Sequence, residues 1–369
     1  MFDALIPHLP VLHVVVPMVA APITIMLPPG RLPWLWAVLV SWVTFAISIA
    51  LLMEVRDADV ISYALGGWAP PLGIEYRVDF ANALVLLLIS AVASIVFPYA
   101  RRSVEAEIDP AQTSLFYCAL LICFTGLLGV TITGDAFNVF VFLEISSLST
   151  YALVALGAKR DRRALSSAFN YLIMGTIGAT FFVIGIGLLY MATGTLNMND
   201  MHDKLAGLDN RMVRAGFAFI VVGIGLKLAM FPLHLWLPNA YTFAPSAVTA
   251  FLAATATKMA VYVLIRFLYT VFGLDLNFEF ESLTLTAILL PLGIIGMTAA
   301  SLVAVFQDCV KRMLAYSSVA QIGYMLLGIA LATEAGVAAA LVHVFNHALM
   351  KAALFMAVGC IVLRLGSTR

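Results

Sequence analysis

The stretch "VVGIGLKLAMFPLHLWLPNA", residues 221–240, is long and apolar enough to cross a membrane, yet it carries Lys227 and Pro232 near its middle. A lysine at the centre of a membrane helix costs about 2.5–3.5 kcal/mol, so it needs a partner, water or a function. Pro232 cannot donate to the carbonyl of Leu228, and the helix should therefore break or kink beside the amine. Broken helices at mid-membrane mark ion sites in transporters, and this stretch predicts one.

The composition extends this interpretation to the whole chain. Of its 369 residues 63% are hydrophobic and 11% are charged, against about 25% charged in soluble domains. A membrane helix needs about 20 apolar residues, which predicts eleven spans near 11–28, 33–54, 80–99, 113–133, 136–157, 165–193, 212–235, 244–272, 284–305, 312–332 and 335–363. The runs are too long for a transmembrane barrel, so the expected fold class is an all-α polytopic membrane protein.

The distribution of basic residues predicts the orientation. One side of the membrane collects eleven of them: Arg31, Arg101, Arg102, Lys159, Arg160, Arg162, Arg163, Lys311, Arg312, Arg364 and Arg369. The other side holds only Arg56, Arg77, Lys204, Arg211 and Arg214. By the positive-inside rule the first side is cytoplasmic and the N-terminus lies outside. No cleavable signal is expected, because the first apolar stretch lacks a basic leader.

Ionisable residues deep inside the spans are few. By the predicted limits they are Glu144, Lys227, Lys258, Arg266 and Lys351. Arg266 lies near a helix end and can extend to the membrane surface. The first three spans, to about residue 110, contain no such residue and are interpreted as scaffold, with His8, His13 and His202 terminal or in a loop.

Glu144 lies in "FVFLEISSLSTYAL", residues 140–153, where its neighbours offer it no water. One acid among buried bases is best explained by pairing with a lysine, and Lys227 is the expected partner. The alternative is a carboxyl that ties helices together through the hydroxyls of Ser146, Ser149 and Tyr151.

The stretch "LVHVFNHALMKAALF", residues 341–355, places His343, His347 and Lys351 on one helical face, with Asn346 adjacent. Histidine titrates near neutral pH, so this stripe is typical of a proton relay. A zinc site is possible from the two histidines, although no carboxylate or thiolate accompanies them and the lysine would repel the ion. A purely structural stripe is the third possibility.

No cofactor, metal or nucleic-acid partner is expected. The four cysteines, Cys118, Cys123, Cys309 and Cys360, show no C-x-x-C spacing and are interpreted as buried bystanders. The net charge is zero, and a quinone-handling enzyme would need a redox centre that the sequence does not offer. A purely structural or assembly role would leave the deep ionisable residues unexplained.

Five stretches carry a resemblance to a known family: "YALGGWAPPLGIEYRVDFANA" (63–83), "TGDAFNVFVFLEISSLSTYALVALG" (133–157), "GIGLKLAMFPLHLWLPNAYTFAPSAVTAFLAATATKMAVYVLIR" (223–266), "FQDCVKRMLAYSSVAQIGYMLLG" (306–328) and "LVHVFNHALMKAALF" (341–355). They resemble the proton-translocating antiporter-like subunits shared by respiratory complex I, membrane-bound hydrogenases and Mrp-type cation/proton antiporters. The first stretch is most similar to the D-type subunits of the Mrp antiporters. The resemblance assigns proton transfer to Glu144, Lys227, Lys258, His343, His347 and Lys351.

The resemblance also implies an architecture of two inverted five-helix repeats. Residues 1–110 would be N-terminal scaffold, 113–272 the first repeat and 284–369 a truncated second repeat. Pairs such as Ser146-Ser147 and Ser317-Ser318, each followed by a glycine at the same offset, agree with internal repeats. The sequence stops at Arg369, before the second broken helix of the family, so we expect about three further helices. Without them, His343, His347 and Lys351 should face lipid.

The function implied by the resemblance is that of one membrane component of a multisubunit Mrp-type Na⁺/proton antiporter in the bacterial inner membrane. Its partners would be the other membrane subunits of the complex, protons and Na⁺, and the lipid bilayer. The alternative is the same part in a complex I-like NADH:quinone oxidoreductase or a membrane-bound hydrogenase. The proteins that purify with the chain would separate these two functions.

Overall fold

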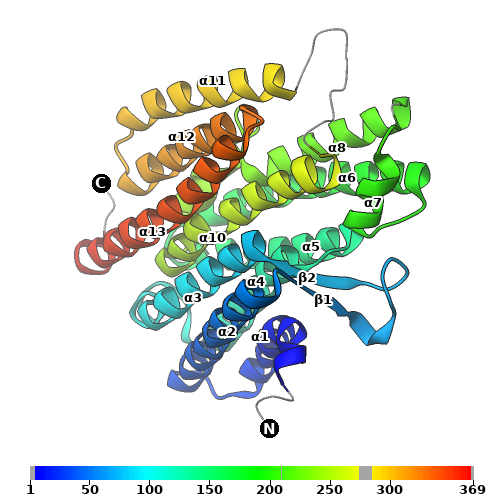
Figure 1. Ribbon diagram of the computed structural model, residues 1–369. Helices are drawn as coiled ribbons and strands as arrows, with labels where there is room; N and C mark the ends of the chain where they lie inside the picture. The colour runs from blue at the N-terminus through cyan, green and yellow to red at the C-terminus, as the bar shows by residue number, and fades with distance from the viewer. Residues whose placement is uncertain (1–4, 209, 274–284, 367–369) are drawn as a thin grey trace.

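The structure of the protein is a computed structural model that describes residues 5–208, 210–273 and 285–366. Helices make up nearly all of it (Figure 1). In chain order the elements are η1 (Ile6–His8), α1 (Leu9–Met26), α2 (Arg31–Ala58), β1 (Val60–Ala64), η2 (Leu65–Gly67), β2 (Glu75–Asp79), α3 (Phe80–Glu107), η3 (Pro110–Gln112), α4 (Thr113–Ile132), α5 (Ala136–Ala155), η4 (Leu156–Lys159), α6 (Arg163–Thr193), α7 (Met198–Leu205), α8 (Arg211–Leu228), α9 (Trp236–Phe243), α10 (Ser246–Ile265), η5 (Arg266–Val271, a π-helix), α11 (Leu285–Val305), α12 (Val310–Ala330) and α13 (Glu334–Leu365).

The chain is an all-α polytopic membrane protein, as the sequence predicts. Within the described residues, 10 helices are long and apolar enough to cross a membrane. The seventh predicted span, 212–235, is not one continuous helix: α8 ends at Leu228, and α9 begins only at Trp236. The prediction that this crossing ends at residue 235 is wrong, because α9 continues it to Phe243 and buries Trp236, Leu237 and Tyr241.

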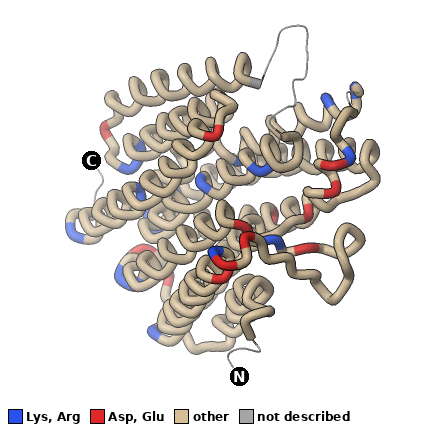
Figure 2. Tube along the Cα trace, in the orientation of Figure 1, with Lys and Arg blue, Asp and Glu red and all other residues tan. Residues whose placement is uncertain are grey.

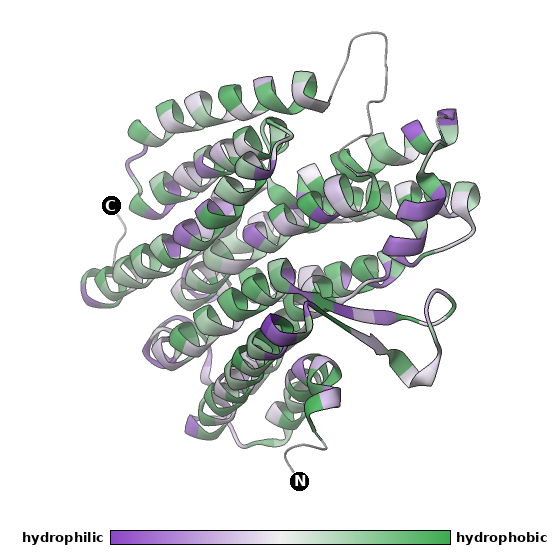
Figure 3. Cartoon of the chain, in the orientation of Figure 1, coloured by the Kyte–Doolittle hydropathy of each residue, from purple (hydrophilic) through white to green (hydrophobic). Residues whose placement is uncertain are grey.

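The bundle has two chemically different ends. At one end lie the antiparallel strands β1 and β2 and the short helix α7, to the right in Figure 1. We call this the hairpin end. At the other, basic end, on the left in Figure 2, many of the Lys and Arg residues gather at helix termini. Hydrophobic residues run along the helices between the ends, and hydrophilic residues colour much of β2 and α7 (Figure 3).

The predicted basic side coincides with the basic end for the residues that the structure describes. Lys311 lies at this end as well, but it is 1% exposed and is therefore a buried residue and not a loop charge. Arg369 lies outside the described residues. Helices α4 to α6 and α11 to α13 cross in opposite senses, as inverted repeats require, because α4 begins at the basic end and α11 at the hairpin end. The division of the chain into three domains stays a prediction.

The N-terminal helices contain a buried polar chain that the sequence interpretation missed. His13 is not terminal but lies inside α1, fully buried. Its Nε2 lies 2.6 Å from the hydroxyl of Ser48 on α2, which lies 2.7 Å from that of Ser90 on α3. The expectation that His13 is terminal or in a loop is therefore wrong, and this polar chain ties the three helices together.

The break between α8 and α9 has a local cause. After Leu228 the backbone turns left-handed at Ala229 (φ 59°), and Pro232 lies within the non-helical segment that follows. The carbonyls freed at the end of α8 find new donors: the Leu226 oxygen accepts the indole N–H of Trp236 at 2.9 Å, and the Gly225 oxygen accepts the amide of Met230 at 2.9 Å. These bonds satisfy polar groups that lipid could not.

Candidate functional site

The Glu144 carboxylate and the Lys227 amine form an ion pair across the interface of α5 and α8. The Lys227 Nζ lies 2.9 Å from Glu144 Oε1 and donates also to the hydroxyl of Ser147 at 2.7 Å. Lys227 stands one residue before the end of α8, so the amine lies beside the helix break. The predicted pairing is confirmed.

The alternative in which hydroxyls hold the carboxylate finds no support. Ser146 donates to the Leu143 carbonyl at 2.9 Å and Ser149 to the Ile145 carbonyl at 2.8 Å, both in their own helix. The hydroxyl of Tyr151 is buried without a hydrogen-bond partner among the described residues.

A small cavity lies between Lys227 and α10. Its volume is about 20 Å³, and Ser146, Ser147 and Thr150 line one side while Ala256, Met259 and Ala260 of α10 line the other. A water molecule needs about 10–15 Å³ and a few polar partners, and this cavity offers both. The position connects the ion pair toward the next buried lysine.

Lys258 is that lysine, and it lies on the most buried helix of the bundle. Its side chain is 1% exposed, and 94% of the apolar window of α10 is buried. The amine donates to the carbonyl of Ala253 and, at 3.2 Å, to the hydroxyl of Thr257. The described residues give it no carboxylate partner, so its charge depends on these two weaker acceptors.

The stripe on α13 is assembled as predicted, but His347 and Lys351 are buried and His343 is partly buried. His347 is 0% and Lys351 2% exposed, whereas the neighbouring Asn346 points outward. The expectation that the stripe faces lipid is wrong, because α10 and α12 cover it. Lys351 donates to the Leu314 carbonyl of α12 at 2.8 Å.

The two histidines of the stripe stack on each other. The ring centroids of His343 and His347 are 6.1 Å apart with an interplanar angle of 10°. Both ring nitrogens of His347 are buried and lack a hydrogen-bond partner among the described residues. The stripe lies on α13, which packs against α10, the helix that carries Lys258. His, Cys, Asp and Glu side chains in the described ranges form no group of three that could hold a metal ion.

Arg266 does not extend freely to the membrane surface. It makes an ion pair with Asp79, the N-cap residue of α3, and donates to the hydroxyls of Tyr262 at 2.7 Å and Thr270 at 3.3 Å. Its position near a helix end was predicted, but its partners come from a distant part of the chain that the sequence does not place beside it.

Two further buried charges at the basic end were missed. Lys311 donates to the Ala244 carbonyl at the end of α9 at 3.1 Å. Glu107, 7% exposed, accepts the backbone N–H of Ser246 at 3.1 Å and so binds the N-terminus of α10, the helix that carries Lys258. Lys311 lies one residue before the predicted span 312–332, and Glu107 lies eight residues after the predicted span 80–99, because α3 continues to Glu107. The predicted limits therefore place both residues in loops.

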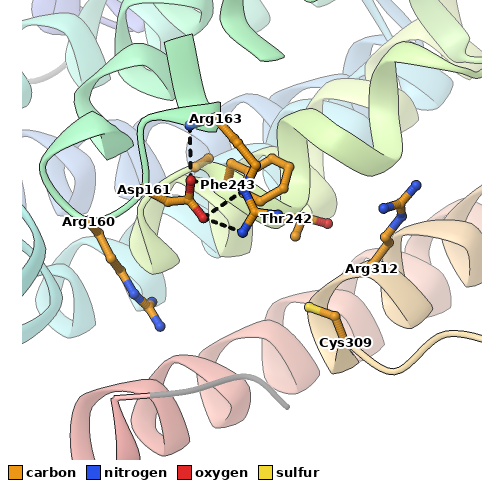
Figure 4. A pocket seen from close by; sticks show the side chains of 8 residues that line it. Arg160, Asp161, Arg163, Thr242, Phe243, Cys309 and Arg312 are labelled. Atoms are coloured by element: carbon orange, nitrogen blue, oxygen red, sulfur yellow. Dashed lines mark hydrogen bonds and ion pairs between the residues drawn. The ribbon is translucent and has the colours of Figure 1, made fainter. Parts of the chain in front are cut away.

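A larger cavity of about 150 Å³ opens at the basic end beside these residues (Figure 4). Asp161 and Arg163 face each other there at 2.6 Å, and hydrogen bonds from Arg163 lower the pKa of the Asp161 carboxyl. The Arg163 guanidinium lies 4.5 Å from the ring centroid of Phe243. The lining residues are Arg160, Asp161, Arg163, Thr242, Phe243, Ala244, Cys309 and Arg312.

The four cysteines, interpreted from the sequence as buried bystanders, differ in their burial. Cys118 and Cys123 are buried, Cys309 is intermediate and Cys360 is exposed, so the expectation of four buried thiols is wrong for the last two. His234, in the break, is 7% exposed and stacks on Phe231 with ring centroids 5.3 Å apart.

These features define a class: a polytopic membrane protein in which a row of buried ionisable groups runs beside a broken helix. Residues 133–369 match the family described as NADH:quinone oxidoreductase/Mrp antiporter, transmembrane. The chain belongs to this family.

The relatives include a subunit of an NADH-quinone oxidoreductase and subunits of Na⁺/H⁺ antiporters. The N-type subunit from the NADH-quinone oxidoreductase of Desulforudis audaxviator is 39% identical over 95% of this chain and 70% of its own length. The D-type subunit from the Na⁺/H⁺ antiporter of Alkalihalophilus pseudofirmus is 32% identical over 85% of this chain and 62% of its own. The chain thus spans about two thirds of the length of these relatives.

Solved structures give the same result. A chain of the archaeal membrane-bound sulfane sulfur reductase superposes with a TM-score of 0.90 at 32% identity, covering 97% of this chain and 72% of the other. A chain of the Mrp complex from a Dietzia species gives 0.89 at 28% identity, covering 98% and 66%.

Proposed function

We propose that the chain is a proton-translocating subunit of a multisubunit Mrp-type monovalent cation/proton antiporter. Protons would move along Glu144, Lys227, Lys258 and the stripe of His343, His347 and Lys351. The observation that carries this proposal is the Glu144–Lys227 ion pair at 2.9 Å, placed beside a helix break and a water-sized cavity.

The pair offers a way to load and release a proton. While the carboxylate lies beside Lys227, its charge stabilises the protonated amine, and the hydrogen bond from the amine to Ser147 fixes the geometry. Moving the amine away by even a few ångströms removes that stabilisation in a surrounding of low dielectric. A water in the adjacent cavity would then take the proton toward α10.

Beyond Lys258, the contact between α10 and α13 supports transfer to the stripe. Lys258 on α10 and Lys351 on α13 are both buried, and the two helices pack against each other. His343 and His347 lie along the same face of α13, so a proton that reaches one ring could pass to the other.

The partial exposure of the Glu144 side chain supports the inference that a partner subunit covers it. Its side chain is 23% exposed at a depth where lipid cannot solvate a carboxylate. The relatives named above are subunits of larger assemblies, and we infer that another membrane protein of the complex covers this residue. We place the complex in a bacterial inner membrane with Na⁺ as the exchanged cation, the basic end in the cytoplasm and the hairpin end and N-terminus outside.

A second candidate function is the same translocating part in a redox-driven proton pump. The 39% identical relative belongs to an oxidoreductase, and the sulfane sulfur reductase chain superposes as well as the Mrp chain. The composition of the purified complex decides between the two. Iron–sulfur proteins indicate the redox pump, and further antiporter subunits without them indicate the antiporter.

Glu144→Gln tests the proposed function directly. The amide keeps the shape of the side chain and can still accept a hydrogen bond, but it removes the charge that holds a proton on Lys227. We expect an assembled complex in which the proton efflux that added cation drives from acidified inverted vesicles, read with a pH-sensitive dye, falls close to background. Transport at the wild-type level would show that the carboxylate is structural and would overturn the proposal.

Glu105→Gln is the matched control. Glu105 also pairs with a base, Arg101 at 3.0 Å, but its side chain is 60% exposed at the basic end. The same chemical change there should leave transport unchanged.

A further inference from the structure

A second row of polar side chains starts at Lys258 and leads away from the proposed route. Tyr262 and Arg266 follow Lys258 at intervals of four along α10 and into η5, and Thr270 continues the row. The row ends at the hairpin end, where Arg266 meets Asp79. A tyrosine hydroxyl one helical turn from a proton-carrying lysine is in the right place to pass a proton on.

Such a passage would uncouple the protein. If Lys258 carries protons, as the proposed function holds, a relay through Tyr262 would connect it directly to the hairpin end without using the stripe on α13. Antiport and redox pumping both require that this shortcut be closed.

The hydrogen bonds of the Tyr262 hydroxyl block this route. The Tyr262 hydroxyl donates its proton to the backbone carbonyl of Thr131 at 3.1 Å and accepts the Nε–H of Arg266 at 2.7 Å. A relay needs a donor that releases a proton and an acceptor that passes one on. Arginine keeps its proton at physiological pH, and a carbonyl has no proton of its own to pass on.

Arg266 is held in this position from several sides. Its guanidinium pairs with Asp79, which also caps α3 through the amide of Asn82. The Arg266 side chain is only 16% exposed, and its carbon Cζ lies 5.3 Å from the ring centroid of Tyr262. A fixed positive charge at the mouth of the row repels an approaching proton, as arginines do in selective channels.

The space beside the row is too small for a water chain. The cavity lined by Tyr262, Arg266, Thr270 and Arg77 has a volume of about 10 Å³, which is at the lower limit for a single water. We propose that Arg266, fixed by Asp79 and bonded to Tyr262, is a proton seal that separates Lys258 from the hairpin end.

If Arg266 blocks proton passage, removing its guanidinium should let protons leak across the membrane through the complex. The purified complex is placed in liposomes with an internal pH dye, without Na⁺ or redox substrates, and a K⁺ diffusion potential is applied. Wild type should show the slow proton flux of the lipid, and Arg266→Gln should raise it several-fold, because the hydroxyl of Tyr262 becomes free to relay. A flux equal to wild type would overturn the seal.

A double variant separates a relay from general damage. Tyr262→Phe alone should stay sealed, and Arg266→Gln combined with Tyr262→Phe should return to the wild-type flux, because no hydroxyl remains. A double variant that leaks as much as Arg266→Gln would overturn the proposal. Arg77→Gln, which removes a charge from the same cavity without touching Tyr262, should not leak.

Two further results keep the test decisive. If Arg266→Gln fails to assemble, Arg266→Lys replaces it; lysine can release its proton, so a leak is expected and a tight complex contradicts the seal. The transport assay of Glu144→Gln judges the proposed function separately. A wild-type flux in Arg266→Gln together with lost transport in Glu144→Gln rejects only the seal.

Discussion

At the scale of single residues, the site depends on where one carboxylate is placed among several bases. Lys227 has Glu144 as a counter-charge, whereas Lys258 and Lys351 have only carbonyl or hydroxyl acceptors in the described structure. Removing one partner of a buried pair costs about 3–5 kcal/mol, because the other charge is left uncompensated. The unequal partners therefore give the lysines unequal abilities to hold a proton.

Lys227→Arg tests whether this lysine carries a proton or only a charge. Arginine keeps the positive charge and can pair with Glu144, but it does not release its proton at physiological pH. We expect a normally assembled complex with transport near background in the inverted-vesicle assay. Lys204→Arg is the control, since Lys204 pairs with Asp200 at 2.8 Å on α7 and its side chain is 46% exposed. Full activity of Lys227→Arg would rule out the carrier role.

The sequence predicts the Glu144–Lys227 pair well because a lone acid in an apolar run has few possible partners. It fails for His13, Glu107 and Lys311, which the structure buries. Burial near a helix end depends on what packs there, and the partners of these residues lie on other elements. The Arg266–Asp79 pair is missed for the same reason, since 187 positions separate the two residues.

At the scale of elements, α8 is positioned by close contact with α6. Gly223 faces Gly178 and Phe182 so closely that a Cβ on Gly223 would lie 2.7 Å from both the Gly178 carbonyl oxygen and the Phe182 amide nitrogen. Small residues commonly allow membrane helices to approach in this way. Gly223 lies one turn before Lys227, so this contact also sets the position of the amine.

Gly223→Ala should therefore disturb the site without changing any charged group. The methyl group meets backbone atoms that cannot rotate away, and overpacking of this kind costs about 1–3 kcal/mol. We expect a lower thermal unfolding temperature of the purified complex and reduced transport. Gly187→Ala on α6, where a Cβ would meet nothing within 4 Å, is the control and should lower neither. Unchanged stability in Gly223→Ala would show that α8 is free to move away from α6.

The long helices are predictable because about 20 apolar residues in a row have few alternatives in a membrane. The short elements β1, β2, α7 and α9 were not predicted. The two strands and α7 are too short to give a span signal, and α9 follows a break that hydropathy does not resolve. Their positions depend on contacts such as that of Asn197 with Glu75 at 2.8 Å, which join loops distant in sequence.

At the scale of the whole molecule, one face of α5 is unusual. Glu144 shares this face with Val141 and Leu148, three residues before and four after it, which are 36% and 58% exposed. A carboxylate between two exposed apolar residues is unfavourable against lipid and favourable against a protein that supplies a polar group. The family consists of subunits that act in membrane assemblies, and this face is the place where the site reaches the surface of the chain.

A photo-reactive amino acid at position 148 can identify what covers this face. Such a group reacts with whatever lies beside it, so in the intact complex we expect a cross-link between this chain and another membrane protein of the assembly. The same group at Leu302, 65% exposed on α11 and on a different helix of the bundle, provides a reference for the background of lipid and protein adducts. The Lys227 amine is hydrogen-bonded to Glu144 and Ser147 and not to Leu148. Transport should therefore persist in the labelled complex before illumination. If position 148 yields lipid adducts alone, Glu144 faces the bilayer, and the inference that a neighbouring protein completes the site is wrong.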